Sequence, residues 1–319
     1  PRAIAAMAEA AVEAWKYGDP TSHDLRAALA QRHGVTPDHI VVGEGIDALL
    51  GLTARLFVGP GDTVVTSAGG YPTFDFHVTG FGGVLDRVPY RDDRQDAAGL
   101  VARAAQAGAR LIYLCNPDNP MGGFLEPSVI TAAVARLPKD AVLLLDEAYG
   151  EFAPALPAID PDDPRVIRFR TFSKAYGMAG ARVGYAIAAP QVIRAYDRVR
   201  NHFGVNSVGQ AGALAALGDG AWLDRTRAQV AAARDRIAQV ARENGLSPLP
   251  SATNFVTIDC GRDGDFARAV LAALAHRGVF VRMPWVAPQD RCIRVSCGPK
   301  AELDAFAEAL PQALAAVRG

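Results

Sequence analysis

The chain has 319 residues, of which 50% are hydrophobic and 21% are charged, and its formal net charge is −1. This length allows one large domain with a smaller companion, and the composition is ordinary for a globular enzyme. A charge near zero gives no general attraction to nucleic acid or to an anionic membrane, so we expect neither partner. No apolar run approaches the roughly 20 residues that a membrane span needs, and we expect a cytoplasmic protein.

The four cysteines predict neither a metal site nor a disulfide framework. They are Cys115, Cys260, Cys292 and Cys297. None shows Cys-x-x-Cys spacing or paired histidines nearby, which fits a reducing compartment. We therefore expect no metal, and we expect buried, inert thiols where cysteines lie in apolar runs.

The first two thirds of the chain alternate short apolar runs with helical patterns. After an opening helix within residues 1–16, strands are predicted at His39–Val42, Thr63–Thr66, Gly83–Val88, Leu111–Cys115, Val142–Asp146, Val166–Arg170 and Gly184–Ala188. Several are almost entirely apolar, as strands covered on both faces are. Helices such as Ile46–Phe57 lie between them, so the pattern favours an open, mostly parallel α/β sheet.

The sequence pattern changes after about residue 210, where a smaller α+β domain is predicted. Its expected elements are a helix at Trp222–Asn244, strands at Phe255–Cys260, Val279–Arg282 and Cys292–Ser296, and a final helix from Ala301. We assign residues 17–210 to the large domain. Residues 1–16 and 211–319 are assigned to the small domain, with a boundary set to within about ten residues.

One lysine stands apart from the others. Lys174 lies in the segment Thr171-Phe-Ser-Lys174, just past a predicted strand and among small and apolar residues. A nucleophilic lysine must lose its proton at low cost, and an enclosed site lowers its pKa. Ser173 and Arg182 add a hydroxyl and a guanidinium that suit a phosphate. Without these neighbours Lys174 would be interpreted as a surface lysine on a turn.

Three polar residues are expected at the carboxyl edge of the sheet, where ligands bind in such folds. Asp146 ends an apolar strand, and it either caps the following turn or holds a cationic ring nitrogen. Tyr149 follows it closely, and Asn119 comes after the preceding strand. Both are able to donate to the phenolate oxygen of the same ring, which lowers the pKa of an imine formed there.

Four further residues suit an anionic or flat ligand. Gly45 and Ile46 stand between a strand and the start of a helix, whose free N–H groups attract anions. Phe74, in Tyr-Pro-Thr-Phe, either stacks on a flat ring or packs in the core. Arg294 lies on a late strand, where it either grips a carboxylate or stays exposed.

Together these segments resemble the fold-type I aminotransferases that use pyridoxal 5′-phosphate (PLP), most closely the histidinol-phosphate aminotransferase subfamily. The resemblance covers nearly the whole chain, in the order of the family. The matching segments are Tyr17-Gly-Asp-Pro, Gly43-Glu-Gly-Ile-Asp47, Tyr71-Pro-Thr-Phe74, Asn116–Gly122, Asp146-Glu-Ala-Tyr149, Arg170–Arg182, Thr253-Asn-Phe255 and Arg291–Val295. Asp-Glu-Ala-Tyr, followed by Ser-Lys-Ala and Ala-Gly-Ala-Arg-Val-Gly, is the most specific combination.

The resemblance implies a three-layer αβα large domain with a mostly parallel sheet, a smaller α+β domain, and a homodimer with shared active sites. Lys174 would carry PLP as a Schiff base and move a proton during ping-pong transamination. Asp146 would hold the ring nitrogen, Tyr149 and Asn119 the ring oxygen, and Phe74 would stack on the ring. The phosphate would be bound by Gly45, Ile46, Thr171, Ser173, Arg182 and the partner subunit's Tyr17.

For the substrate, the resemblance implies an amino-acid or amine donor and a 2-oxo acid such as 2-oxoglutarate. Arg294 would bind the α-carboxylate, with Asn119 close by. Histidinol phosphate, in histidine biosynthesis, is the leading donor. Met121 departs from the family's usual Thr, Ile46 replaces a small residue, and the sequence locates no pocket for a second phosphate.

Two kinds of alternative stay open. An aromatic or broad-specificity aminotransferase, or a threonine-phosphate decarboxylase, would keep the cofactor and change the reaction or substrate. A non-catalytic PLP-binding regulatory domain is disfavoured, because the chain has no winged-helix segment and its net charge is close to zero.

Overall fold

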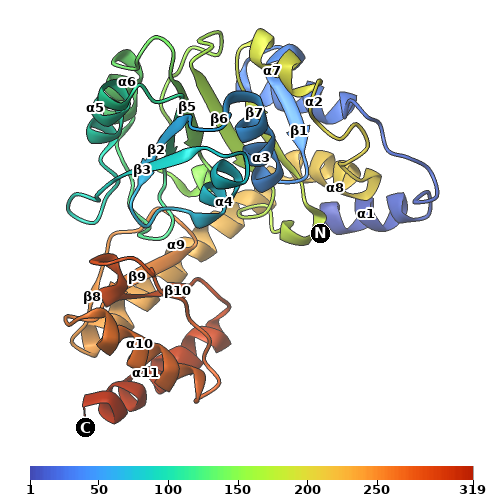
Figure 1. The fold of residues 1–319 in the computed structure, drawn as a ribbon. Helices are drawn as coiled ribbons and strands as arrows, with labels where there is room; N and C mark the ends of the chain where they lie inside the picture. The colour runs from blue at the N-terminus through green and yellow to red at the C-terminus, as the bar shows by residue number, and fades with distance from the viewer. Residues whose placement is uncertain (319) are drawn as a thin grey trace.

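The computed structural model describes residues 1–318, and its largest element is a seven-stranded sheet (Figure 1). Its strands are β1 (Ile40–Gly43), β2 (Thr63–Ser67), β3 (Val84–Val88), β4 (Leu111–Cys115), β5 (Val142–Asp146), β6 (Val166–Thr171) and β7 (Gly184–Ile187). They lie in the order β1-β7-β6-β5-β4-β2-β3. Only β7 runs antiparallel to its neighbours β1 and β6, so the predicted mostly parallel sheet is confirmed.

The central strands are apolar throughout because they are buried on both faces. In β4, Leu111, Tyr113 and Cys115 enter the core on one face of the sheet. Ile112 and Leu114 enter the core on the other face. This alternation is the two-residue repeat of a strand, and it explains why no polar face appears in the sequence of β4 or β5.

Helices form the outer two layers. One face is covered by α3 (Ile46–Phe57), α4 (Pro72–Gly80) and α7 (Pro190–Tyr196). The other face is covered by α5 (Ala97–Ala107) and α6 (Pro127–Ala135) toward one edge, and by α2 (His23–His33) and α8 (Ser207–Leu217) toward the other. The predicted three-layer αβα arrangement is therefore present. Short 3₁₀ helices occur at η1 (Pro37–His39), η2 (Gly150–Phe152), η3 (Ala179–Ala181) and η4 (Gln289–Arg291).

A smaller α+β unit follows the large sheet, as predicted. The long helix α9 (Gly220–Glu243) leads from the large core into it (Figure 1). Its antiparallel sheet contains β8 (Ser247–Pro248), β9 (Phe255–Asp259) and β10 (Cys292–Ser296). Helices α10 (Gly264–Ala275) and α11 (Lys300–Arg318) pack with α9 around this sheet.

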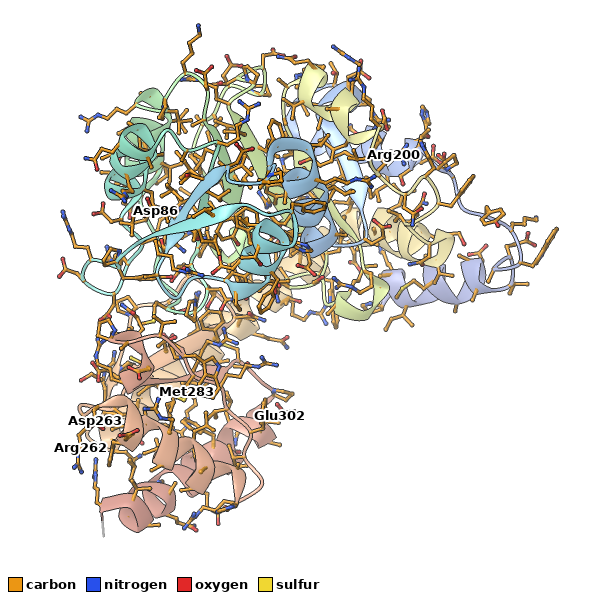
Figure 2. The ribbon with its side chains drawn as sticks, in the orientation of Figure 1. Asp86, Arg200, Arg262, Asp263, Met283 and Glu302 are labelled. Atoms are coloured by element: carbon orange, nitrogen blue, oxygen red, sulfur yellow. The ribbon has the colours of Figure 1, made fainter. Side chains whose placement is uncertain are left out.

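Local rules account for the details of the small unit. Asp263 is the N-cap of α10, and its Oδ1 accepts a hydrogen bond of 3.0 Å from the N–H of Phe266. Met283 lies in the core of the small unit, whereas Arg262 and Glu302 lie on its surface (Figure 2). The hydrophobic core of the small unit is thus separate from that of the large unit. A site at the strand ends of the large sheet faces the small unit.

The structure corrects the expected strand at Val279–Arg282. This segment is a loop, in which Arg282 alone forms an isolated bridge with Arg294 of β10. The sequence of this loop is apolar because Val281 is buried in the core of the small unit. The loop does not pair with the β9–β10 sheet along its length. Burial of a short segment by a loop gives the same sequence signal as a strand.

The structure also corrects the placement of the opening helix in the small domain. Helix α1 (Arg2–Ala11) packs along α8 of the large unit, and Met7 lies against Gly212, where a side-chain Cβ would come within 2.6 Å of Met7. The glycine leaves the room that Met7 occupies. The boundary between the cores also falls later than residue 210, within α9, because Leu223 belongs to the large core and Ala233 to the small one.

Candidate active site

A cavity of about 180 Å³ lies at the carboxyl ends of β4, β5 and β6, beside the start of α3. It is lined by Ile46, Asp47, Tyr71, Cys115, Asn119, Asp146, Ala148, Tyr149, Thr171, Ser173, Lys174, Ala179 and Arg182. Eight of the predicted site residues are among these. They come together because parallel strands end at one edge of the sheet, where successive loops meet.

Lys174 stands in the loop after β6 and reaches into the cavity. Its Nζ lies 5.4 Å from the ring centroid of Tyr149. Burial lowers the pKa of the Lys174 ammonium, the Asp146 carboxylate opposes this, and the positive charges of Arg294 and Arg182 lower it further. An amine with a lowered pKa is more often neutral, which is the form that attacks a carbonyl carbon.

Asp146 ends β5 and points its carboxylate into the cavity wall. Its side chain is 3% exposed, and burial raises the pKa of this carboxyl. One oxygen, Oδ1, accepts a hydrogen bond of 2.9 Å from the N–H of Ala148, and the other, Oδ2, accepts one of 2.7 Å from the hydroxyl of Tyr113. Both donors favour the charged form, so the carboxylate is held in a fixed plane.

Groups that suit an anion gather where the cavity meets the start of α3. Helix α3 starts here, and the N–H groups of its first turn have no acceptor within the helix. Arg182 reaches the same place, and its Nη1 donates to the carbonyl of Ala179 at 2.9 Å. The Ser173 Oγ accepts a hydrogen bond of 3.0 Å from the hydroxyl of Thr171. Arg182 forms no salt bridge within residues 1–318, so its charge is available to a ligand.

Gly45 is required at this point by geometry. Its φ is 90°, and a Cβ there would lie 2.5 Å from the Nη2 of Arg182. The expectation that the Gly45 N–H points to the anion is not met, because this group donates to the carbonyl of Gly43 at 2.8 Å. Ile46 and Asp47 stand in the first turn of α3 and offer N–H groups instead.

Asn119 is held in place by a fixed loop after β4. Asn116 exchanges two hydrogen bonds with Leu125, one of 3.0 Å and one of 2.8 Å, which close the loop at its base. Asp118 accepts bonds from the Tyr90 hydroxyl and the N–H of Met121, at 3.0 and 3.1 Å. Burial raises the pKa of Asp118 to about 6, although these donors oppose the shift. The loop therefore presents Asn119 to the cavity with little freedom.

Arg294 comes from β10 of the small unit and meets Asn119, to whose side-chain oxygen its Nη1 donates. Its guanidinium lies 4.7 Å from the ring centroid of Phe255. Arg282 exchanges both backbone hydrogen bonds with Arg294, at 3.0 and 2.6 Å. Residues paired in this way project their side chains on the same side. Neither arginine forms a salt bridge within the described part of the chain.

Arg282 was not among the residues predicted to form the site, although it directly follows the apolar residues 279–281. Burial lowers the pKa of the Arg294 guanidinium, Tyr149 opposes this, and the charge of Arg282 adds to the lowering. The like charges of Arg282 and Arg294 repel each other, whereas the Asp118 carboxylate favours the charged form of Arg294. A signal in the sequence was present, since Arg282 and Arg294 are both basic residues in predicted strands of the small domain.

The expected stacking of Phe74 on a ligand is not supported, and the structure places Phe74 in the core instead. Its side chain is 0% exposed and stacks on Tyr113, with ring centroids 4.8 Å apart. Tyr71 lines the cavity in its place. The reason is that Pro72 starts α4, so Tyr71 lies in the loop at the end of β2 and Phe74 lies on the inner side of the helix.

Tyr17 does not reach the cavity of its own chain. It is 83% exposed and packs against Phe203, with ring centroids 4.8 Å apart. The segment that carries it follows α1 and projects from the large unit (Figure 1). The contact with a partner subunit's cofactor site stays a prediction for Tyr17.

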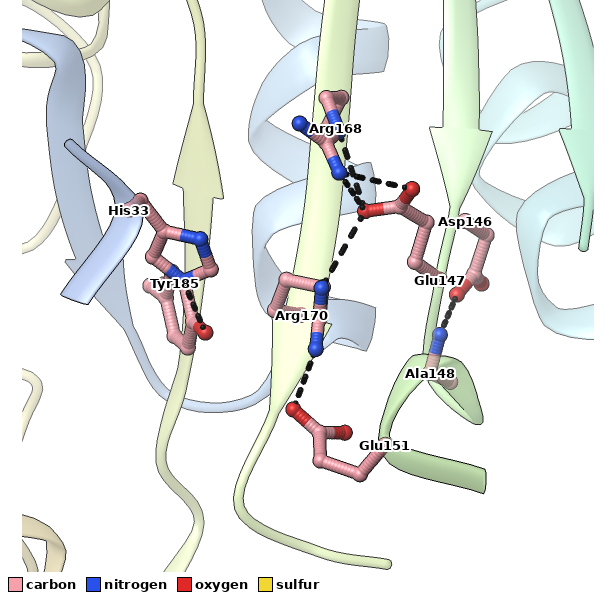
Figure 3. Close-up of polar contacts among 8 residues, drawn as sticks. All are labelled: His33, Asp146, Glu147, Ala148, Glu151, Arg168, Arg170 and Tyr185. Atoms are coloured by element: carbon pink, nitrogen blue, oxygen red, sulfur yellow. Dashed lines mark hydrogen bonds and ion pairs between the residues drawn. The ribbon is translucent and has the colours of Figure 1, made fainter. Parts of the chain in front are cut away.

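A buried network of charges lies behind the cavity (Figure 3). Arg168 forms hydrogen bonds of 3.1 and 3.0 Å to the carboxylate of Glu147. Arg170 lies 3.6 Å from the same carboxylate and 2.5 Å from that of Glu151. Burial opposes the charge of Arg170, but Glu151, Tyr185 and Glu147 overcome it and raise the pKa of the guanidinium. The network joins the loop after β5 to the end of β6.

Residues 1–318 show no arrangement typical of a metal site or of a membrane-spanning helix. No group of three or more His, Cys, Asp or Glu side chains there is arranged to hold a metal ion. Nor does any helix in the same residues have the length and apolar character needed to cross a membrane.

Comparison with known proteins identifies the family. The model of the family "Aminotransferase class I and II" matches residues 1–310. The chain belongs to this family. Relatives include the histidinol-phosphate aminotransferase of Moorella thermoacetica, 33% identical over 99% of this chain and 82% of that protein. Histidinol-phosphate aminotransferase 2 of Ralstonia nicotianae is 37% identical over 94% of this chain and 81% of that protein.

Solved structures of aminotransferases share the fold. The histidinol-phosphate aminotransferase from Sinorhizobium meliloti, in complex with pyridoxal-5′-phosphate, has a TM-score of 0.97 and 50% identity, covering 99% of this chain and 88% of that one. An aspartate aminotransferase of Thermus thermophilus has a TM-score of 0.84 at 24% identity, covering 98% and 92%, and shows the fold alone. The predicted fold-type I architecture and the prediction of a PLP-dependent aminotransferase are confirmed.

The cavity of this aminotransferase fits the cofactor of its family. A fixed, buried carboxylate matches a ring nitrogen that carries a proton, and Asp146 supplies it. The start of α3 with Arg182 and Ser173 suits a phosphate. Lys174, with its lowered pKa, lies along the same cavity. The residues present therefore match a ring, a carbonyl and a phosphate in one molecule.

Proposed function

We propose that this enzyme transfers the amino group of histidinol phosphate to 2-oxoglutarate. The observation that carries the substrate is the pair Arg282 and Arg294, whose backbones are hydrogen-bonded to each other. Arg294 also donates to Asn119, and neither arginine forms a salt bridge within residues 1–318. A phosphate ester carries close to two negative charges at neutral pH, and two guanidinium groups match that charge. The relatives that cover almost the whole chain are named for the same substrate.

PLP bound in the cavity would supply an electron sink that makes the substrate Cα–H acidic. We assign the ring nitrogen to Asp146 and the ring oxygen to Tyr149 and Asn119. The phosphate is assigned to the first turn of α3, Thr171, Ser173 and Arg182. Tyr71, from the loop after β2, is assigned to the face of the ring in place of Phe74.

Each residue of the site then has its own role in the proposed reaction. Lys174 would hold the cofactor through its Nζ, and its free amine would accept the proton from the substrate Cα and hold it on Nζ as an ammonium. Burial lowers the pKa of the Lys174 amine, which favours its neutral form. Arg294 and Arg282 bind the anionic end of the donor, and Arg294 binds the α-carboxylate of the oxo acid. Asn119 orients Arg294 through their direct hydrogen bond.

The enzyme is proposed to work as a homodimer. The aromatic and apolar side chains of Val12, Trp15, Tyr17 and Phe203 are 76%, 78%, 83% and 53% exposed. Large exposed apolar side chains gathered on one projecting segment are typical of a protein–protein interface. A second copy of this chain would cover them, and the partner's Tyr17 would reach the phosphate end of the cavity.

The substrate is tested by half-reactions of the PLP-loaded enzyme, followed by the spectral change of the cofactor. Histidinol phosphate is expected to react with a KM at least about tenfold below that of phenylalanine, whose carboxylate carries one negative charge where the phosphate ester carries close to two. Arg282→Gln should raise the KM for histidinol phosphate by about tenfold or more and leave that for phenylalanine within about twofold, because only the former loses a charged contact.

Other outcomes identify the alternatives. Equal use of aromatic donors, with no effect of Arg282→Gln, would support a broad-specificity aminotransferase. Release of carbon dioxide from threonine phosphate without amino transfer would support a decarboxylase. Arg262→Gln, which removes an exposed arginine of the small unit remote from the cavity, is the matched control and should change neither KM.

A further inference from the structure

Tyr113 is a buried tyrosine to which the proposed reaction gives no role. It lies in the middle of β4, is 1% exposed, and does not line the cavity. Its hydroxyl nevertheless donates a hydrogen bond of 2.7 Å to Oδ2 of Asp146 on the neighbouring strand. β4 and β5 run parallel, with Tyr113 paired to Leu144, so the phenol reaches Asp146 along the sheet.

The hydrogen bond from Tyr113 affects the charge of Asp146, because few other groups face this carboxylate. The groups that face the carboxylate are the Ala148 N–H, the Tyr113 hydroxyl, the Lys174 ammonium and the more distant Glu147 carboxylate. Burial and Glu147 favour the protonated acid, whereas the two donors and Lys174 favour the carboxylate. Of these, the tyrosine hydroxyl is the one side chain that both touches Asp146 and carries no charge, so its effect does not depend on what Lys174 binds.

The hydroxyl is held rigidly in its place. The Tyr113 ring stacks on Phe74, with centroids 4.8 Å apart and ring planes inclined by 23°. Both rings belong to the same packed core beneath α3 and α4. Burial raises the pKa of the Tyr113 phenol well above its usual value, and the Asp146 charge raises it further, so the hydroxyl keeps its proton. It can therefore act only as a donor toward Oδ2.

We propose that Tyr113 is a positioning residue for the reaction, which keeps Asp146 charged and oriented so that the shared proton stays on the ring nitrogen of the cofactor. Without the phenol, Asp146 gains proton affinity, and the proton moves from the nitrogen to the carboxylate. A neutral ring withdraws electrons less well. The inference rests on the proposed placement of the ring nitrogen against Asp146.

The test is the variant Tyr113→Phe, which removes the hydroxyl and keeps the ring that stacks on Phe74. The enzyme is loaded with PLP labelled with ¹⁵N in the ring, and the ¹⁵N chemical shift reports whether that nitrogen is protonated. We expect the wild-type signal in the protonated range and the variant signal moved toward the neutral range. The Kd for PLP should rise about tenfold, as expected for loss of a hydrogen bond to a charged group, and kcat should fall while KM changes little.

Tyr196→Phe is the matched control, because it removes another buried tyrosine hydroxyl from the same core, one that bonds Thr53 and not Asp146. Its ¹⁵N shift should equal that of the wild type, even if both variants lose similar thermal stability. An unchanged ¹⁵N shift in Tyr113→Phe would overturn the inference and leave Tyr113 a packing residue. A neutral nitrogen in the wild type would instead overturn the placement of the ring against Asp146, so the two failures are distinct.

Discussion

Single residues in this protein acquire their chemistry from burial and from a few charged neighbours. Lys174 has a lowered pKa because it is largely enclosed, and Asp146 limits the shift by its opposite charge. Asp146 in turn needs two donors to stay ionised in the same enclosed place. The pKa of Lys174 and the pKa of Asp146 therefore depend on each other. Removing either side chain would change the pKa of the one that remains.

His33 shows the same principle away from the site, at the end of α2. Burial lowers the pKa of His33 to about 3, and the charges of Arg170 and Arg168 add to the shift. Its Nε2 lies 2.9 Å from the Tyr185 hydroxyl. Because the unfolded side chain has a pKa of 6.5, acid favours the unfolded state. The contribution of His33 is complete above that pH and is lost as the pH falls toward 3.

We predict that His33→Gln makes the protein less sensitive to acid. Between pH 7 and 5 the free energy of unfolding of the wild type should fall by about 1–2 kcal/mol more than that of the variant. Urea denaturation at both pH values measures this difference, and His276→Gln at an exposed position serves as the control. Equal pH dependence of wild type and His33→Gln would contradict the assignment.

At the scale of elements, the active site depends on how the loop after β5 is fastened to β6. Asp146 and Tyr149 belong to the first segment, and Thr171 and Lys174 belong to the second. The Arg170 guanidinium joins them through Glu147 and Glu151 (Figure 3). It also lies flat against Gly150, where a Cβ would come within 3.0 Å of its Cζ. A larger residue at position 150 would push this connection apart.

We predict that Arg170→Met destabilises the protein by about 3–5 kcal/mol, because the buried Glu151 carboxylate loses the one cation paired with it in residues 1–318, and Glu147 keeps only Arg168. Arg165→Met, just before the same strand but in a pair with Asp163 that is partly exposed, should cost less than about 1 kcal/mol. Urea denaturation gives both values. Addition of Glu151→Gln to Arg170→Met should cost less than the two single changes combined, and strict additivity would show that the pair is not coupled.

At the scale of the whole molecule, two units are joined around the cavity. Arg291 of the small unit forms ion pairs of 2.7 Å with Asp93 of the large unit and with Asp259 of its own. Nearby, the Thr257 hydroxyl donates to the carbonyl of Pro120 at 2.7 Å, next to Asn119. These contacts set the distance between Arg294 and the strand ends of the large sheet. The substrate end of the site therefore depends on the docking of the two units.

The proposed dimer adds a third contribution, and we predict that complementation reveals it. Lys174→Ala and Tyr17→Ala are each expected to be poorly active at low PLP concentration. Mixed under conditions that exchange subunits, they should regain about a quarter of wild-type activity, because half the dimers are mixed and one site in each is complete. Sedimentation velocity tests separately whether the protein forms a dimer. Activity no higher than the mean of the two variants would contradict a shared site.

Much of this architecture follows from the sequence alone. The strands from β1 to β7 were predicted to within about two residues, because their apolar runs and turn residues report local geometry and burial together. The order of Asn119, Asp146 and Lys174 after successive strands indicated one site, since parallel strands end at one edge. The motif resemblance indicated the family, which the comparisons confirmed.

Only the tertiary structure decided which side chains face the cavity and which support it. Tyr71 and Phe74 are close in sequence, yet the start of α4 between them sends one to the cavity and the other to the core. Helix α1 lies on the large unit because Gly212 leaves room for Met7. Arg282 meets Arg294, and Tyr113 meets Asp146, through pairings between strands and loops. Such contacts join residues that are distant along the chain, and no local pattern encodes them.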